Sequence, residues 1–160
     1  MTTVSQLKQD LDSKWCTSLR VRWLQACLQF LESVAPQGLP PRPRLTAMVE
    51  DQLLLSDLES STNGCLPLDV ATRHGQVLKG QFLVQALDCV NVSEPSDRRY
   101  THTSNRTLKL GLFDGKTLVS AMELTHIPQI SLDFPAGFKV RLFLPSIASD
   151  DPLLTRFAYR

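Results

Sequence analysis

The sequence lacks a long hydrophobic run and an excess of charge of either sign. Its 160 residues include 17 basic and 16 acidic side chains, which gives a formal net charge of +1. No apolar stretch approaches the roughly 20 residues that cross a bilayer, and the N-terminus lacks the basic and apolar regions of a secretory signal. We therefore expect a soluble, intracellular protein. Any nucleic-acid binding must depend on a local basic patch.

The patterns of common catalytic and metal sites are also missing. The sequence contains no Gly-rich phosphate loop and no nucleophile elbow. Its four cysteines are scattered without a C-x-x-C pair, and its histidines have no acidic or cysteine neighbour at metal-ligand spacing. The sequence predicts a protein that is not an enzyme and that holds no cofactor and no metal.

Three helices are predicted in the first part of the chain. The first spans residues 4–14. Residues 19–34 repeat apolar side chains at three- and four-residue spacing, and Ser18 is the candidate N-cap. Several prolines between residues 36 and 43 end this second helix and form a stiff connector. Thr46 is the expected N-cap of a third helix that runs to about Ser60.

Four or five strands are predicted in the rest of the chain. Residues 81–92 predict a long curved strand, residues 138–144 alternate as another, and the tail at 152–160 supplies a last short one. This spacing is typical of a small barrel such as the OB-fold. We predict an α+β fold in which a three-helix bundle (1–62) packs on a five-stranded OB-fold β-barrel (63–160).

Residues 108–124 predict a β-hairpin. Asp114 and Gly115 form the dipeptide that two-residue type I′ turns prefer, because both central positions need a positive φ. With these two residues at the tip, Leu110 faces Val119. Alternation then places one apolar set on a single dry face: Leu108, Leu110, Leu112, Val119 and Ala121. The dipeptide indicates structure and carries no information on function.

A polar loop, SEPSDRRYTHTSNR, occupies residues 93–106. It holds the one local concentration of charge, in which Arg98, Arg99 and Arg106 surround Tyr100 and His102. Basic residues interleaved with aromatic ones can track a nucleic-acid strand, whereas the plainer interpretation is a solvated surface loop. Loops of this length in small domains are often functional. The glycosylation-type triplets that begin at residues 91 and 105 are interpreted as chance matches.

Several segments in order resemble a known family. They are VRWLQACLQFLES, LLLSDLESS, LPLDVATRHGQVLKGQFLVQALDCVNVSEP, LKLGLFDGKTLVSAMEL and PAGFKVRLF. Together they resemble the N-terminal region of the RecQ-mediated genome instability protein 1 family, over about residues 15–144. The segments contain six short motifs in the right order: W-L-x-A-C, L-L-x-x-D-L, L-P, V-S-x-P, L-x-D-G and P-x-G-x-K-V. Each motif is weak alone, but the six together are fairly specific.

The resemblance implies a non-catalytic scaffold with helices packed on an OB-fold. Members of this family belong to the topoisomerase III and RecQ helicase complex, which dissolves double Holliday junctions during recombination and repair. The implied partners are topoisomerase III and a RecQ-family helicase, with a second small OB-fold subunit left open. The implied location is the nucleus, with no membrane association and only weak or indirect DNA contact.

The resemblance also assigns a site. In the family, a loop between the first two strands reaches into the topoisomerase gate, and here that loop is residues 91–106. The residues it implies as partner-binding are Val92, Glu94, Pro95, Asp97, Arg98, Arg99 and Tyr100. The loop is short for a vertebrate member.

Two alternatives stay open. A short loop is also found in Tudor domain-containing protein 3, a relative whose OB-fold binds topoisomerase IIIβ. The other alternative is an OB-fold that itself binds single-stranded nucleic acid. Against it, the second and third strands offer only Phe113 and Lys109 for such a surface.

Overall fold

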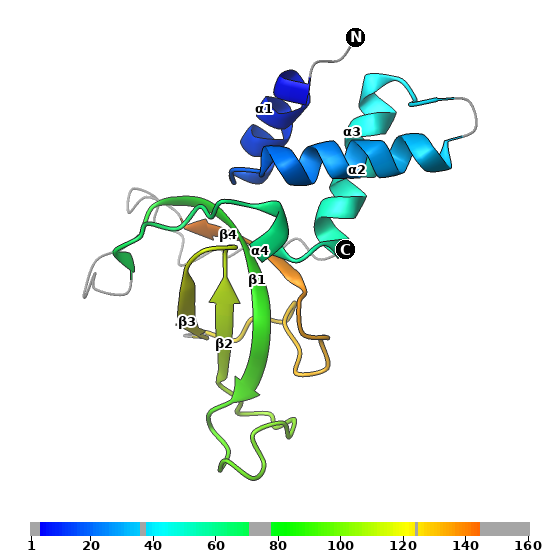
Figure 1. Cartoon of the computed structure of the whole chain (residues 1–160). Coiled ribbons are helices and arrows are strands. Elements are labelled where there is room, and N and C mark those ends of the chain that lie inside the picture. Colours follow the sequence, from blue (N-terminus) through cyan, green and yellow to red (C-terminus); the bar gives the residue numbers. More distant parts are fainter. Residues whose placement is uncertain (1–3, 36–37, 71–77, 124, 145–160) are drawn as a thin grey trace.

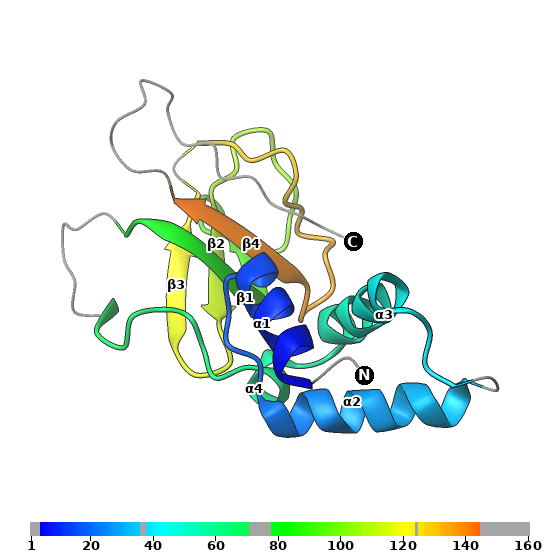
Figure 2. The same cartoon turned by 90° about the horizontal axis from the view of Figure 1, so that it is seen from above.

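The computed structural model of the chain describes residues 4–35, 38–70, 78–123 and 125–144. Helices form the N-terminal part and a curved antiparallel sheet forms the rest (Figure 1). The helices lie at one end of the sheet, and the loop that follows the first strand lies at the opposite end. Figure 1 shows this separation from the side, and Figure 2 looks at the molecule from the helical end, with the helices in front of the sheet.

The helical part contains four helices. They are α1 (Val4–Trp15), α2 (Val21–Val34), α3 (Arg42–Leu55) and α4 (Leu58–Ser61). The first two predicted helices are confirmed, but Ser18 does not cap α2, which begins after Arg20 without a side-chain cap. The reason is that Leu19 is extended and forms an isolated bridge with Thr62. No helix in the described part of the chain is long and apolar enough to cross a membrane.

The predicted third helix is two helices, so the three-helix bundle was wrong. The helix α3 begins at Arg42, with proline in its first turn, where a fixed φ suits the helix. Thr46 lies inside α3 and its hydroxyl donates to the Arg42 carbonyl. The chain leaves helical geometry at Ser56, and Asp57 then caps α4 by accepting the Glu59 N–H.

The sheet contains four strands in the order β3-β2-β1-β4, and every pair is antiparallel. They are β1 (Gly80–Asn91), β2 (Leu108–Phe113), β3 (Leu118–Met122) and β4 (Lys139–Leu144). These four predicted strands are confirmed. The described residues form a four-stranded sheet and not the predicted five-stranded barrel. The fifth strand was predicted at 152–160, which lies outside the described residues.

The hairpin is confirmed, but its predicted register was wrong. Leu110 pairs with Ala121, not with Val119. Asp114 donates its N–H to the Thr117 carbonyl, so Gly115 and not Asp114 takes the first central position of the turn. The φ of Gly115 is +98°, and type II′ turns place glycine at this position. Because the register differs by two residues, each side chain stays on its predicted face.

Two apolar clusters form the core. The first joins the helices and includes Leu83 from β1, while the second fills the inside of the curved sheet. Neighbouring β1 residues Phe82 and Val84 belong to the second cluster. The strand β1 therefore serves both clusters, one on each face.

Candidate functional site at the loop between the first two strands

A buried asparagine fixes both ends of the β1–β2 loop (residues 92–107). Asn91 has no exposed surface. Its Nδ2 donates to the Thr101 carbonyl (3.2 Å) and to Thr103 Oγ1 (3.1 Å), and its Oδ1 accepts the N–H groups of Ser93 and Thr107 (both 3.1 Å). One side chain therefore ties the first and last parts of the loop together. Sequence reasoning missed this role, because Asn91 stood out only as part of a glycosylation-type triplet.

Backbone hydrogen bonds shape the rest of the loop. The Asn91 N–H donates to the Arg99 carbonyl (2.7 Å), so the chain folds back beside the end of β1. Two successive turns follow, because Arg98 N–H donates to Pro95 O (2.9 Å) and Thr101 N–H donates to Arg98 O (2.8 Å). The tip of the loop is thus a folded projection and not an extended strand.

The structure places all seven residues of the predicted partner site on this loop. Glu94 is half-buried and the other six are exposed: Val92, Pro95, Asp97, Arg98, Arg99 and Tyr100. Tyr100 is 65% exposed, and the Arg99 guanidinium lies 5.6 Å from the centre of its ring. A cation at this distance over an aromatic face is weakly attracted to it. Arg99 and Tyr100 therefore form a small exposed surface on the loop that combines a positive charge with an aromatic ring.

Arg106 does not belong to this exposed cluster, which corrects the predicted group of three arginines. Its guanidinium is largely buried and donates to the carbonyls of Ile127 (3.0 Å) and Ile130 (2.7 Å). It also lies 3.5 Å from the buried carboxylate of Glu123. Arg106 therefore anchors the segment before β4 to the base of the loop.

A second polar link joins the loop to the same segment. His102 Nε2 lies 3.0 Å from Asp133 Oδ1 at the surface. Hydrogen bonds from His102 and Ser131 lower the pKa of the Asp133 carboxyl from its ordinary value. This exposed pair is a weak link at the surface, and the buried contacts of Arg106 hold the two segments together at their base.

A groove of about 220 Å³, lined mostly by apolar residue types, opens between the β1–β2 loop and the segment before β4. We call it the side groove. Its floor comes from β1, where an irregularity between Ala86 and Asp88 leaves Leu87 as an extra residue. Its lining residues are Ala86, Leu87, Asp88, Cys89, Tyr100, Leu132, Phe134, Ala136 and Phe138. No sequence pattern indicated this groove, because its walls come from three separate segments.

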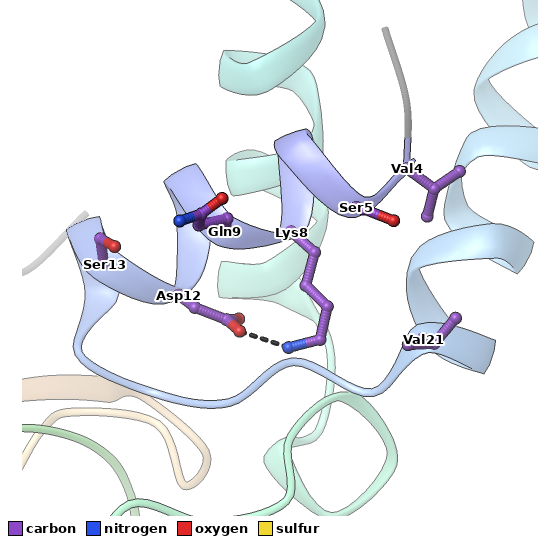
Figure 3. A pocket seen from close by; sticks show the side chains of 7 residues that line it. All are labelled: Val4, Ser5, Lys8, Gln9, Asp12, Ser13 and Val21. Atoms are coloured by element: carbon purple, nitrogen blue, oxygen red, sulfur yellow. Dashed lines mark hydrogen bonds and ion pairs between the residues drawn. The ribbon is translucent and has the colours of Figure 1, made fainter.

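A second hollow, of about 280 Å³, lies beside α1 (Figure 3). It is lined by Val4, Ser5, Lys8, Gln9, Asp12, Ser13 and Val21. The ammonium of Lys8 and the carboxylate of Asp12 pair within it, and Asp12 also accepts the Leu19 N–H (2.8 Å). Its central charges already have partners inside the chain, so this hollow offers little to a ligand.

The hairpin tip is a structural junction. The buried Asp114 carboxylate accepts the N–H groups of Cys65 (2.7 Å), Leu66 (2.6 Å), Lys116 (2.9 Å) and Thr117 (2.7 Å). Burial alone would raise the pKa of this carboxyl, but the four donors outweigh burial and lower the pKa. Sequence reasoning placed Asp114 in a turn and missed its partners 48 and 49 residues away.

The described residues contain no group of three or more side chains that could hold a metal ion. Burial raises the pKa of the Cys65 thiol to about 12 and that of the Cys89 thiol to about 11. Both groups are therefore neutral thiols near pH 7, and a neutral thiol is a poor nucleophile.

Comparisons with known proteins match both parts of the chain. A family model described as "RMI1, N-terminal helical domain" matches residues 17–61, and one described as "RMI1, N-terminal OB-fold domain" matches residues 66–154. RecQ-mediated genome instability protein 1 of Oryza sativa subsp. japonica is 32% identical over 125 residues, which cover 76% of this chain and 15% of the rice protein.

Two further relatives show the same pattern of partial coverage. RecQ-mediated genome instability protein 1 of Danio rerio is 28% identical over 159 residues, which cover 84% of this chain and 31% of the fish protein. Tudor domain-containing protein 3 of Xenopus tropicalis is 33% identical over 89 residues, which cover 56% of this chain and 12% of that protein. The chain spans less than a third of the length of each of these relatives.

Proposed function

The chain belongs to the RecQ-mediated genome instability protein 1 family, and from this premise we propose that it is a nuclear, non-catalytic scaffold that binds topoisomerase III. In this proposal it also associates with a RecQ-family helicase and promotes the dissolution of double Holliday junctions. Residues 1–62 act as the helical part and residues 63–160 as the OB-fold part. The family membership itself supports the coarser statement, a role in genome stability linked to RecQ proteins.

The β1–β2 loop is the structural feature that best supports the proposal. Its base is fixed by Asn91, while its tip is exposed and lies away from the helices (Figure 1). Of the seven candidate residues, none belongs to either apolar cluster. A loop that adds nothing to the core and is nevertheless fixed at its base is well suited to enter a partner.

The charge of the loop favours a protein partner over a nucleic acid. Glu94 and Asp97 offset Arg98 and Arg99, so the tip has no net charge. Tight binding to a phosphate backbone depends on several lysines and arginines that displace counterions. The tip offers two such side chains beside two carboxylates.

The test is to replace residues 94–100 with a Gly/Ser segment of equal length. This change keeps Asn91, Thr101 and Thr103, and therefore keeps the hydrogen bonds at the base of the loop. We expect an unchanged melting temperature, a loss of a few-fold in affinity for topoisomerase III, and a much larger loss of stimulation in decatenation or double-junction dissolution. A double variant of exposed α2 residues, Gln25→Ser with Gln29→Ser, is the matched control. Equal stimulation by the loop variant and the control would reduce the loop to a spacer.

Two alternative functions have their own support. Arg99 over Tyr100 is a feature that could bind single-stranded nucleic acid, and a nanomolar, salt-sensitive affinity for oligonucleotides would favour that function. The similarity to Tudor domain-containing protein 3 supports an adaptor of topoisomerase IIIβ. Affinities measured side by side for the two topoisomerase III paralogues would separate this adaptor from the leading proposal.

A further inference from the structure

We propose that the side groove receives one bulky apolar side chain of topoisomerase III, and that an acidic residue next to it pairs with Arg98 or Arg99. This inference rests on the proposed function, and it adds the place and the chemistry of the contact. The groove adjoins the β1–β2 loop, because Tyr100 belongs to both. A partner that engages the loop therefore passes over the groove.

The bulge in β1 creates the apolar floor. Leu87 is the extra residue between two ladder pairs, Ala86 with Leu112 and Asp88 with Gly111. A bulge of this kind re-aims a side chain, and Leu87 is 41% exposed although it lies within a strand. Phe134 and Phe138 pack edge to face on another side, with ring centres 5.1 Å apart. The large side chains exposed in the side groove are Leu87 and Tyr100, whereas Phe134 and Phe138 form a wall that packs against the apolar cluster of the sheet.

The walls of the groove are held in place before any partner arrives. The Gly137 N–H donates to the Ala86 carbonyl (2.7 Å), which fixes the wall near Phe138 to the strand. His102 and Asp133 join the loop to the opposite wall, and Arg106 holds the Ile130 carbonyl beneath it. A preformed site avoids the entropic cost of ordering its walls on binding.

The size of the groove indicates a single side chain. Small-molecule sites usually measure roughly 300–1,000 Å³, and the side groove measures about 220 Å³. Protein interfaces commonly concentrate their affinity in a few large side chains that fill pockets near the centre of the contact. A leucine, phenylalanine or tryptophan of the partner fits this description.

The charges around the groove indicate which kind of partner residue lies next to the inserted apolar side chain. Arg98 and Arg99 are exposed, and neither forms an ion pair among the described residues. The Arg99 guanidinium lies over the Tyr100 ring, at the loop side of the groove. Asp88 lines the groove from β1, and its carboxylate repels a phosphate backbone that would cross the groove. A partner segment with one acidic side chain on the loop side would pair with an arginine and would keep its negative charge away from Asp88.

The experiment uses Leu87→Asp in the full chain, with Leu118→Asp as the matched control. Both leucines are exposed strand residues, but Leu118 lies on β3, away from the groove. We expect Leu87→Asp to weaken binding to topoisomerase III at least tenfold, and Leu118→Asp to change it less than twofold. Both melting temperatures should stay near that of the unchanged chain.

Two further variants keep the test decisive. If Leu87→Asp lowers the melting temperature, Ala136→Trp fills the groove from an exposed wall residue and should give the same loss of affinity. Arg98→Glu combined with Arg99→Glu should weaken binding mainly by slowing association, and less so at high salt.

The outcomes separate this inference from the proposed function. If the unchanged chain binds topoisomerase III and both leucine variants bind equally well, the groove is not the contact and only this inference fails. If the unchanged chain does not bind topoisomerase III, both the proposed function and this inference fail. If Leu87→Asp weakens binding to an oligonucleotide and leaves topoisomerase III binding intact, the groove is a nucleic-acid site and the inference is overturned.

Discussion

At the scale of single residues, Asp114 makes the stability of the protein depend on pH. Its folded pKa lies below the ordinary value of roughly 3.9, because four backbone N–H groups stabilise the carboxylate. A carboxyl with a lowered folded pKa adds stability that is fully present above the unfolded pKa. That stability is lost as the pH falls through the folded pKa. We predict that the free energy of unfolding falls below about pH 4.

The variant Asp114→Asn tests this assignment. An amide offers one acceptor oxygen instead of two and brings an N–H₂ group toward buried donors. We therefore expect a loss of about 2 to 4 kcal/mol near pH 7 and a weaker fall in stability at acid pH. Urea unfolding at several pH values measures both effects. The exposed carboxylate of Asp97 provides the control, because Asp97→Asn should leave the curve unchanged. Parallel curves for the unchanged chain and Asp114→Asn would rule out Asp114 as the source.

Gly115 is a second residue on which the stability of the hairpin tip depends, because it packs closely against Leu58 and Thr62. A Cβ added there would lie inside van der Waals contact with Thr62 Oγ1 and the Leu58 carbonyl, and its φ is +98°. Gly38 has a similar φ of +83°, but a Cβ there meets nothing within 4 Å. We predict that Gly38→Ala costs about 1 kcal/mol from backbone strain alone. Gly115→Ala should cost several kcal/mol, because a backbone carbonyl cannot move aside easily. Equal losses of melting temperature in the two variants would mean that Gly115 does not pack closely against Leu58 and Thr62.

These two residues also show what a local pattern can predict. The Asp-Gly dipeptide correctly predicted the hairpin and the face on which each side chain lies. It misplaced the turn by one residue, because the Asp114 carboxylate is bound by Cys65 and Leu66 from a distant segment. Sequence spacing reports neighbours along the chain, whereas this carboxylate is positioned by neighbours in space.

At the scale of elements, Asn91 decides whether the β1–β2 loop is a fixed projection. Its side chain makes four hydrogen bonds to the loop. We predict that Asn91→Ala costs about 1 to 3 kcal/mol, because the groups it pairs lose their partners. We also expect much faster amide hydrogen exchange at residues 93 and 107, whose N–H groups donate to Asn91 Oδ1. Asn105→Ala changes an exposed asparagine of the same loop and should leave exchange as it is. Unchanged exchange in both variants would show that the backbone turns alone hold the loop.

The elements that the sequence predicted well are those with a strong internal period. Apolar spacing located α2 and the alternating strand β4 to within two residues. The break between α3 and α4 was missed, because Leu53, Leu55 and Leu58 continue an apolar pattern across Ser56. In the structure Ser56 instead accepts the Trp23 Nε1–H (3.1 Å), and Asp57 begins a new helix. The residues that line the side groove form no periodic pattern along the sequence, so the groove became visible only in the folded structure.

At the scale of the whole molecule, the helical part and the sheet share side chains and hydrogen bonds. Leu83 of β1 packs into the helical cluster, and Gln85 Oε1 accepts the Leu58 N–H (3.0 Å). The Thr62 hydroxyl donates to the Asp114 carbonyl at the hairpin tip (2.7 Å). The predicted boundary at residues 62 and 63 therefore falls inside a connected region. Two parts joined in this way should unfold together.

The tryptophans make this cooperativity measurable. The chain has two, Trp15 and Trp23, and both lie on helices and pack against the helical cluster, so their fluorescence reports mainly on the helical part. Leu110 is buried in the other cluster, on β2. Truncating a buried leucine to alanine usually costs about 2 to 5 kcal/mol. If the molecule is one cooperative unit, Leu110→Ala should lower the fluorescence midpoint in urea as much as the midpoint from circular dichroism.

The matched control for this experiment is Leu53→Ala, which lies in the helical cluster and next to the reporters. It should lower the fluorescence midpoint whether or not the two parts are coupled, so it sets the size of the direct effect. A fluorescence midpoint that stays fixed in Leu110→Ala while it falls in Leu53→Ala would mean that the sheet unfolds separately. In that case Leu83, Gln85 and Thr62 would be contacts between independent units. Coincident shifts would instead mean that a disturbance in the sheet that carries the β1–β2 loop reaches the helices, so that partner binding at the loop stabilises the whole chain.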